Sequence, residues 1–321
     1  TLGFDISEKR IKELSEKYDS NKEYYKKDFI GKKITFSNKT KDLEGSNVYI
    51  ICVPTPIKKN NLPDLSFIKK SISIISTYIK SKDIIVLEST VYPGVTEHFA
   101  KFLELKTGLK NNKDFYLCYS PERINPGDKT KKIKDINKIF AINTSNKSIL
   151  LRIKKIYKLI SKKIIFSKKI KEAETAKAIE NTQRDLNIAL MNELAIICNN
   201  LGIDTNDVID TASTKWNFMP FKPGLVGGHC IGVDPYYLTY KAQLLGYKPD
   251  VILAGRTMND NMSEYIANRI NDFVNNSELK LNKIIHIMGL TFKENCNDIR
   301  NSKVYDLYRS LINLGFTVNV H

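Results

Sequence analysis

Short apolar runs alternate with amphipathic segments through the first half of the chain. The apolar runs indicate strands at residues 2–6, 48–53, 84–87, 115–119, 139–142 and 164–166. Between most of them, apolar residues recur with the helical period of about 3.6, at residues 7–18, 65–80, 95–106 and 147–161. Near-continuous apolar strands that alternate with helices are typical of a parallel, doubly wound α/β sheet. A Rossmann-like domain is therefore predicted over residues 1–168.

The pattern changes at residue 171. From there to about residue 201 the chain contains no glycine or proline and keeps a helical pattern, until Gly202 ends it. A helix of this length, roughly 45 Å, usually bridges domains or forms a dimer interface. A segment rich in glycine and proline follows at 216–235, and two further helical segments lie at about 235–246 and 250–276. A central all-helical domain with a long bridging helix is predicted over residues 169–278.

The last part of the chain returns to α/β character. An apolar strand at 283–289, a helix at about 302–314 and a strand at 316–320 predict the start of a second Rossmann-like domain over 279–321. The chain opens in strand-like sequence without an initiator methionine or signal peptide, and it stops in an alternating strand pattern. We therefore expect truncation at both ends, with the first strand and the glycine-rich loop of the first domain missing.

Composition narrows the class of protein. The chain has 321 residues, of which 42% are hydrophobic and 27% charged, as in ordinary globular proteins. No uninterrupted apolar run reaches the 18 or so residues that a membrane helix needs, so no membrane span is expected. The five cysteines form no CxxC motif, which suits a reducing cytoplasm. The four histidines show no metal-ligand spacing, and no metal is expected.

The net charge of +16 is unevenly distributed. Residues 1–171 carry 37 lysines and arginines against 18 acidic residues, a net +19, whereas residues 172–321 carry −3. One interpretation is an anionic partner such as a nucleic acid, a membrane surface or a phosphorylated small molecule. The other is a lysine-biased composition, because only 8 of the 51 basic residues are arginine and no element for reading bases is evident. The second is favoured, and a basic nucleic-acid-binding α/β protein remains an alternative.

Polar, turn-forming segments follow three successive predicted strands, namely Val53-Pro54-Thr55-Pro56, Glu88-Ser89-Thr90 and Ser120-Pro121-Glu122-Arg123. Ligands of open α/β sheets bind at the carboxyl ends of the strands, so these segments indicate a ligand site rather than rigid turns alone. Asp5 also ends a strand. It either accepts the ribose hydroxyls of a dinucleotide or caps the next helix.

Two features lie in the helical part of the chain. Lys177, Asn181 and Arg184 are spaced to share one helix face, which is either solvated or holds a polyanionic ligand. The segment from Gly227-Gly228 to Asp234-Pro235 allows close approach of the backbone, and it carries Cys230. Amides and a nearby lysine could stabilise a thiolate there. Beyond it, Lys293 and Arg300 either face a phosphate or are surface charges.

Taken together, these motifs resemble the UDP-glucose/GDP-mannose dehydrogenase family over essentially the whole chain. Three segments, 120–128, 179–193 and 216–237, look most like the UDP-N-acetylhexosamine 6-dehydrogenases of Vi-antigen, capsule and O-antigen synthesis. The resemblance implies an NAD-dependent, four-electron oxidation of the C6 hydroxyl of UDP-GlcNAc or UDP-GalNAc to a carboxylate. A UDP-glucose 6-dehydrogenase is the alternative within the family.

The resemblance also implies roles for single residues. Cys230 would form a thiohemiacetal and then a thioester, Lys177 would act as acid and base, and Asn181 would donate to the same oxygen. Asp234 would orient Lys177 and order water, and Glu122 and Thr90 would position water or cofactor. The residues implied to bind NAD are Asp5, Thr55, Thr90 and Arg300. Those implied to bind the UDP-sugar are Arg123, Ile124, Lys177, Asn181, Arg184, Gly227, Phe292 and Lys293. A homodimer through the helix at 171–201 is implied as well.

Overall fold

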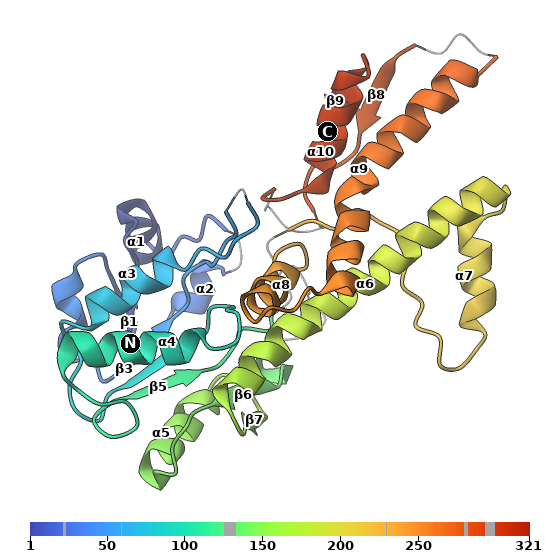
Figure 1. Ribbon diagram of the computed structural model, residues 1–321. Coiled ribbons are helices and arrows are strands. Elements are labelled where there is room, and N and C mark those ends of the chain that lie inside the picture. Colours follow the sequence, from blue (N-terminus) through green and yellow to red (C-terminus); the bar gives the residue numbers. More distant parts are fainter. Residues whose placement is uncertain (22–23, 59, 125–132, 229, 279–281, 293–298) are drawn as a thin grey trace.

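A long diagonal helix joins two α/β parts in this computed structural model (Figure 1). The structure describes residues 1–321 except 22–23, 59, 125–132, 229, 279–281 and 293–298. The first α/β part lies at one end of the long helix α6. The second lies beside α9, at the far side of the molecule. This arrangement confirms the predicted α/β fold with a helical centre. The domain boundaries at residues 168 and 278 remain predictions.

The first part is built on a five-stranded sheet of order β3-β4-β5-β6-β7. The strands are β3 (Val48–Ile51), β4 (Ile84–Leu87), β5 (Tyr116–Tyr119), β6 (Lys138–Ala141) and β7 (Ile164–Ser167). All neighbours are parallel except β5 and β6, which are antiparallel and pair at Tyr119 and Ala141. The all-parallel prediction is wrong at this one pair. A parallel crossover needs a dozen or more residues, usually a helix, whereas the described residues between β5 and β6 contain only the short 3₁₀ helix Ile133–Asp135.

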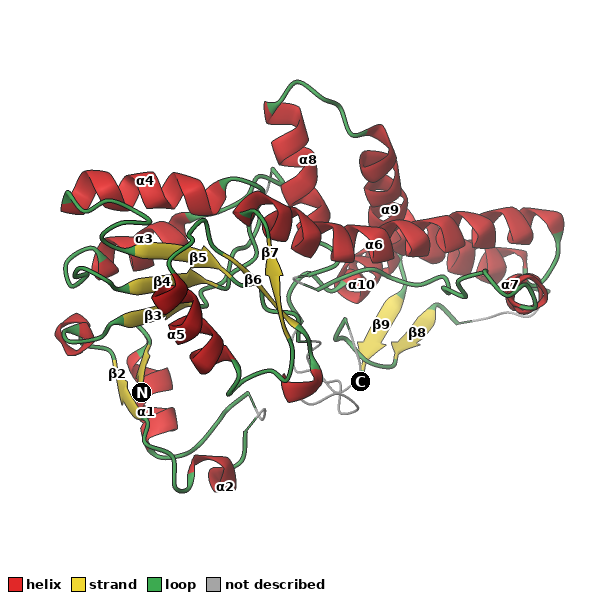
Figure 2. Ribbon diagram, turned by 90° about the horizontal axis from the view of Figure 1, so that it is seen from below, coloured by secondary structure: helices red, strands yellow, loops and turns green. Residues whose placement is uncertain are grey.

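Alternate residues of each strand enter two different cores, as the two-residue period of a strand requires. On one face Ile85, Leu87 and Leu117 pack with α3 (Ser66–Ile75) and α4 (Val95–Thr107). On the other face Ile84 and Cys118 pack with α5 (Lys147–Tyr157). Helices therefore cover both faces of the sheet (Figure 2), which is the predicted doubly wound arrangement.

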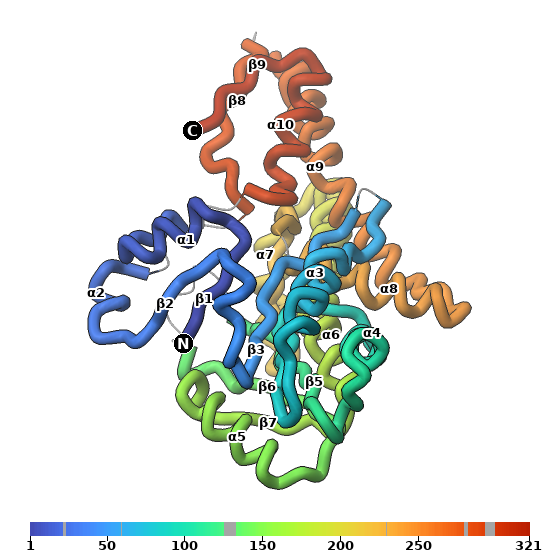
Figure 3. The backbone as a smooth tube through the Cα atoms, turned by 90° about the vertical axis from the view of Figure 1, so that its left-hand side faces the viewer, coloured from blue at the N-terminus to red at the C-terminus, as the bar shows by residue number. Residues whose placement is uncertain are grey.

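The first residues form a smaller parallel pair beside this sheet, seen clearly in Figure 3. It consists of β1 (Leu2–Phe4) and β2 (Thr35–Ser37), with α1 (Glu8–Ser15), α2 (Lys26–Phe29) and the 3₁₀ helix Thr40–Leu43. Strand β2 was not predicted, because its three residues Thr35-Phe36-Ser37 contain a single apolar side chain and form no apolar run. Ser7 caps α1 by accepting a hydrogen bond from the backbone of Arg10 at 3.2 Å.

The central part is helical, as predicted. Helix α6 (Ile170–Leu201) has 32 residues, about 48 Å, and ends at Gly202 in the left-handed conformation. It is followed by α7 (Thr205–Ser213), α8 (Asp234–Leu244) and α9 (Asp250–Asn276). A buried ion pair joins α6 to α9, with 2.6 Å between Asp185 Oδ1 and Arg256 Nη1. Among the described residues, no helix has the length and apolar character needed to cross a bilayer.

Helices α6 and α9 approach closely at Gly255. A methyl group added there would overlap the side chain of Leu186 on α6. We expect Gly255→Ala to lower the free energy of unfolding by about 1 kcal/mol, because the cost of displacing Leu186 exceeds the gain in helix propensity from alanine. Urea unfolding measures the change. Gly224→Ala is the matched control, since nothing lies within 4 Å of its added Cβ. Equal midpoints for the two variants would contradict this packing.

The last part confirms the predicted start of a second α/β unit. Strands β8 (Ile284–Ile287) and β9 (Thr317–Val320) are parallel, and α10 (Lys303–Asn313) connects them. Ile287, Leu311 and Phe316 form a small core with Ala267 of α9. The unit is therefore packed on α9 rather than standing free.

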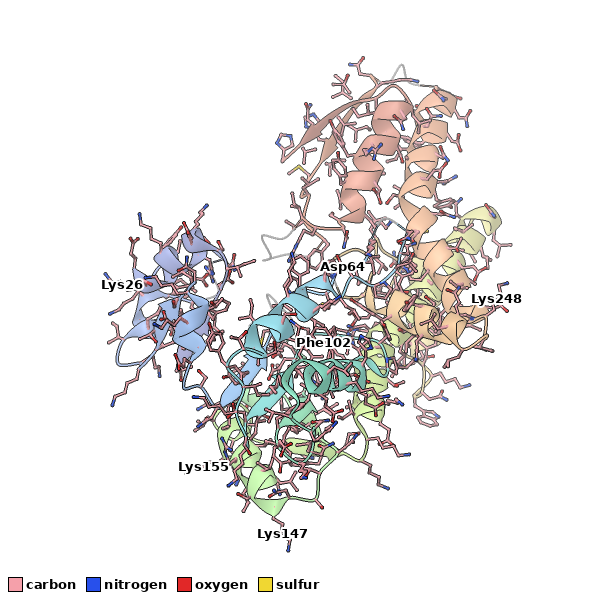
Figure 4. The ribbon with its side chains drawn as sticks, turned by 60° about the vertical axis from the view of Figure 1, so that its left-hand side comes forward. Lys26, Asp64, Phe102, Lys147, Lys155 and Lys248 are labelled. Carbon is pink, nitrogen blue, oxygen red and sulfur yellow. The ribbon has the colours of Figure 1, made fainter. Side chains whose placement is uncertain are left out.

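The lysines that produce the net charge are dispersed. Figure 4 shows Lys26 on α2, Lys147 and Lys155 on α5, and Lys248 between α8 and α9 projecting outward at separate places. All four side chains are exposed. This distribution fits the lysine-biased composition better than a single basic surface for a nucleic acid.

Candidate active site

Cys230 lies in the turn that leads into α8. Its carbonyl oxygen accepts hydrogen bonds from the backbone of Val233 at 3.2 Å and Asp234 at 2.9 Å. Asp234 is the first residue of α8 and is buried. The turn therefore places the half-buried thiol and the buried carboxylate on one short stretch of backbone.

One face of α6 meets this turn. Lys177 and Asn181 are buried, and both reach Asp234 Oδ2. The Lys177 Nζ to Oδ2 distance is 3.5 Å, and the Asn181 amide donates a short hydrogen bond to the same oxygen. Arg184 in turn donates to Asn181 Oδ1. Two residues of the predicted stripe on α6, Lys177 and Asn181, are thus buried, whereas Arg184 at its end is exposed. The stripe joins the cysteine segment across more than 50 residues of sequence.

The charges around Cys230 oppose one another. Burial raises the pKa of the Cys230 thiol, and the Asp234 carboxylate raises it further, whereas Lys177, Arg184 and Arg300 lower it. The net shift is upward. The predicted effect of a nearby lysine is present, since Lys177 lowers the pKa of the Cys230 thiol, but burial and Asp234 raise that pKa by more. Burial also raises the pKa of Asp234, against the opposing effect of Lys177.

The raised pKa gives a testable pH dependence. A thiol whose pKa lies above its usual value is protonated at neutral pH and forms the reactive thiolate only in alkali. We expect alkylation of Cys230 by iodoacetamide, followed by peptide mass spectrometry, to be slow near neutrality and still rising above about pH 9. In Asp234→Asn the profile should move to lower pH. A rate that levels off by neutral pH would contradict the assignment.

Thr55 and Thr90 lie at the carboxyl edge of the sheet, half-buried, as predicted. The Ser89 hydroxyl donates to the carbonyl of Val53 at 2.6 Å, which ties the segments after β3 and β4 together. The Tyr237 hydroxyl of α8 donates to the carbonyl of Thr55 at 2.6 Å. These bonds fix the sheet edge against the helix that carries Asp234.

The segment after β5 is tied to α6. The guanidinium of Arg123 binds both carboxylate oxygens of Glu180, at 3.1 and 2.8 Å. A role in substrate binding was expected for Arg123. In the structure its side chain instead forms an ion pair with Glu180, which lies on α6 three residues after Lys177. Glu122 accepts hydrogen bonds from the backbone of Arg123 at 2.6 Å and of Ile124 at 2.8 Å. Ile124 is exposed.

The remaining predicted residues lie around these groups. The exposed Asp5 ends β1 and accepts a hydrogen bond from the Ser7 backbone at 2.8 Å, so it takes part in the start of α1. The paired glycines do permit close approach, but to the last part of the chain. A Cβ on Gly227 would lie 2.6 Å from the carbonyl oxygen of Asn301, and one on Gly228 would lie 2.8 Å from the Phe292 ring. Arg300 is exposed, and Lys293 lies outside the described residues.

Buried charged groups that the sequence pattern did not reveal include Glu174 and Lys138. Glu174 accepts hydrogen bonds from the backbone of Gly94 and Thr96, at 2.6 and 2.9 Å, and so joins α6 to the start of α4. Lys138 is buried on β6 and contacts Glu88 and Glu122. The only signal for Lys138 in the sequence is a charged residue at the start of an otherwise apolar strand.

The molecule thus consists of an α/β domain with a polar sheet edge, a helical centre and the start of a second α/β unit. This is the arrangement expected of the nucleotide-dependent dehydrogenases that the sequence resembles. Three domain descriptions match the chain: the NAD binding domain of the UDP-glucose/GDP-mannose dehydrogenase family at 1–161, its central domain at 171–261 and its UDP binding domain at 286–321. The chain belongs to the UDP-glucose/GDP-mannose dehydrogenase family and is an NAD-dependent oxidoreductase. This assignment replaces the nucleic-acid-binding alternative.

Individual relatives agree with the family. The chain is 48% identical over 323 residues to Protein CapL of Staphylococcus aureus, covering all of this chain and 76% of that protein. It is 47% identical over 329 residues to the UDP-N-acetyl-D-glucosamine 6-dehydrogenase of Pseudomonas aeruginosa, covering 99% and 76%. Among solved structures, the UDP-D-ManNAc dehydrogenase of Pyrococcus horikoshii superposes with a TM-score of 0.90 at 30% identity, covering 99% and 77%.

The donor groups that follow β1 of the small sheet and β3 and β4 of the five-stranded sheet fit NAD. Asp5 offers carboxylate oxygens of the kind that bind ribose hydroxyls, and Thr55 and Thr90 offer hydroxyl groups. All three lie just after parallel strands, where dinucleotides bind in such folds.

Proposed function

We propose that this enzyme oxidises the C6 hydroxyl of a UDP-N-acetylhexosamine, UDP-GlcNAc or UDP-GalNAc, to the carboxylate. The observation that carries the proposal is the buried cluster in which Lys177 and Asn181 share one oxygen of Asp234 beside Cys230. A primary alcohol becomes a carboxylate by losing four electrons in two steps, and a nearby thiol can retain the aldehyde between them. The relatives that are named UDP-N-acetyl-D-glucosamine 6-dehydrogenase support this substrate.

Two NAD⁺ molecules, bound one after the other, would each supply the hydride acceptor for one of the two oxidations. In the first, the C6 hydroxyl loses its proton toward the Lys177–Asp234 pair as the hydride leaves, and the aldehyde results. Cys230 Sγ then bonds to the aldehyde carbon, and the thiol proton passes to the aldehyde oxygen.

The second oxidation removes a hydride from the carbon and the proton from the oxygen of the thiohemiacetal, leaving a thioester. Lys177 and the Asn181 amide stabilise the negative charge that develops on this oxygen, as hydrogen-bond donors in a dry site do. Water attacks the thioester carbon, the C–S bond breaks, and Cys230 regains its proton. Glu122 accepts the proton of the attacking water, and Thr90 helps to position that water or the cofactor.

The binding residues are proposed as follows. Asp5, Thr55, Thr90 and Arg300 contact NAD. Arg123 and Ile124 contact the sugar from the segment after β5, together with Lys177, Asn181, Arg184, Gly227, Phe292 and Lys293. The product is proposed to serve surface polysaccharide synthesis, with the enzyme in the cytoplasm.

A homodimer through α6 is part of the proposal. Ile179, Leu190, Ile197 and Leu201 are large apolar residues with exposed side chains. Their spacing of 11, 7 and 4 residues keeps them on one side of the helix. A stripe of this kind favours contact with a second copy of the chain. Sedimentation equilibrium tests it, and a monomer at micromolar concentration would remove this part of the proposal.

The substrate is tested by incubating the enzyme with NAD⁺ and each of UDP-GlcNAc, UDP-GalNAc and UDP-glucose, and following NADH. Either N-acetylhexosamine is expected to be turned over faster than UDP-glucose. The reverse order would favour the UDP-glucose 6-dehydrogenase alternative. Mass spectrometry and NMR of the product identify which of the two N-acetylated sugars is used.

A further inference from the structure

Lys138 occupies an unusual place for a lysine. It is the first residue of β6, its side chain is only 5% exposed, and its ammonium lies 2.8 Å from Glu88 Oε2 and 3.2 Å from Glu122 Oε2. The sheet topology explains this placement. β5 and β6 are antiparallel with Tyr119 opposite Ala141, so the same register continued for three residues brings Glu122 opposite Lys138. The Ser120 hydroxyl follows this register by donating to the carbonyl of Ile139 at 2.8 Å.

The inner side of the ammonium is fixed by the core. Glu88 is buried, and its second carboxylate oxygen accepts a hydrogen bond from the Tyr157 hydroxyl at 2.6 Å. The Lys138 ammonium also lies 5.9 Å from the centre of the Tyr157 ring. Glu88, which follows β4, and Tyr157 of α5 thus hold the Lys138 ammonium. Its position therefore does not depend on its contact with Glu122.

The outer side of the ammonium faces Glu122, whose carboxylate is 45% exposed. Two backbone amides occupy Oε1 of this carboxylate, and Lys138 occupies Oε2. Three N–H donors therefore hold the Glu122 carboxylate, while nearly half of the side-chain surface remains exposed. This is the arrangement that a fixed proton acceptor requires, because its plane and direction are set before water arrives.

We propose that Lys138 is a positioning residue that orients Glu122 for hydrolysis of the thioester. This inference rests on the proposed function of Glu122. In the step concerned, the water oxygen bonds to the thioester carbon, one water proton passes to Glu122, and the C–S bond breaks to release the Cys230 sulfur. No electrons are transferred. Lys138 touches neither water nor substrate and acts only through the carboxylate.

The competing interpretation is that Lys138 only neutralises Glu88 in the core. Buried ion pairs often add little to stability, and removal of one partner leaves a buried charge alone. Lys138→Met by itself would therefore confuse the two roles. The double variant Lys138→Met/Glu88→Gln removes the buried pair as a unit and still deprives Glu122 of its ammonium. Glu88→Gln alone is the reference.

Rapid-quench measurement of NADH separates the steps, because two NADH form for each Cys230 before hydrolysis. In Lys138→Met/Glu88→Gln we expect the two NADH to form at the rate of Glu88→Gln, and hydrolysis to be slower by about tenfold, as for a misplaced catalytic group. Mass spectrometry should then show a thioester adduct on Cys230. Lys162→Met is the control, because the Lys162 side chain is 74% exposed and forms a surface pair with Asp135.

Hydrolysis in the double variant as fast as in Glu88→Gln would overturn the inference. Where the double variant forms no NADH, Lys138→Gln replaces it, since its shorter amide reaches only one carboxylate, and accumulation of the adduct is again the expected result. Glu122→Gln separates this inference from the proposed function. Fast hydrolysis in Glu122→Gln would refute the role of Glu122 itself, whereas slow hydrolysis there with fast hydrolysis in the Lys138 variants refutes only the role of Lys138.

Discussion

Replacing Cys230 with serine is expected to abolish formation of the uronic acid. A hydroxyl group is a far weaker nucleophile than a thiol, so the aldehyde is not retained for the second oxidation. The change removes little volume, and the contacts of the turn are made by backbone atoms of Val233 and Asp234. Binding of NAD and of the UDP-sugar should therefore persist. Mass spectrometry of the products and calorimetric titration of the nucleotides measure the two effects separately.

Cys52→Ser is the matched control. Cys52 follows β3 and takes no part in the contacts among Lys177, Asn181 and Asp234. Turnover in this variant should resemble that of the unaltered enzyme. Uronate production by Cys230→Ser at an undiminished rate would exclude the thioester route.

Replacing Lys177 with alanine should reduce turnover by about 10²–10⁴-fold, the usual contribution of a general acid or base. The variant also leaves the buried Asp234 carboxylate without its cation, and the Asn181 hydrogen bond remains. Lys171→Ala is the control on the same helix. Lys171 is exposed and pairs with Glu97 at the surface. Steady-state NADH production reports both variants.

Thermal unfolding of Lys177→Ala must accompany the kinetics, because loss of the cation near a buried carboxylate also destabilises the fold. Folded protein with strongly reduced turnover supports the assigned role. Folded protein with normal turnover would remove Lys177 from the chemistry.

The alternation of apolar runs and amphipathic segments sufficed to predict most of the fold. Each strand of the five-stranded sheet is a compact run, and the strand period explains why its residues enter two cores. The relative direction of neighbouring strands could not be predicted in this way, because an apolar run looks the same in a parallel and in an antiparallel pair. The antiparallel pair of β5 and β6 therefore could not be predicted.

The site was partly predictable. Lys177 and Asn181 are one helical turn apart, so their common face follows from spacing alone. Their contact with Asp234 is long-range and came only through the family resemblance. The direction of the Cys230 pKa depends on burial and on distances to charges, which a linear pattern does not contain. The bridge from Arg123 to Glu180 was missed for the same reason, since each residue alone reads as a surface charge.

Side chains at fixed angular positions around helix α6 connect it to α4, α8 and α9. Glu174 holds the start of α4, Lys177 and Asn181 hold Asp234, and Asp185 holds Arg256 of α9. One inserted or deleted residue rotates everything beyond it by about 100°. A single such event between residues 174 and 185 would break several of these contacts at once. A substitution in this stretch changes only one contact. Homologous enzymes that keep these contacts should therefore tolerate substitutions here far better than insertions or deletions.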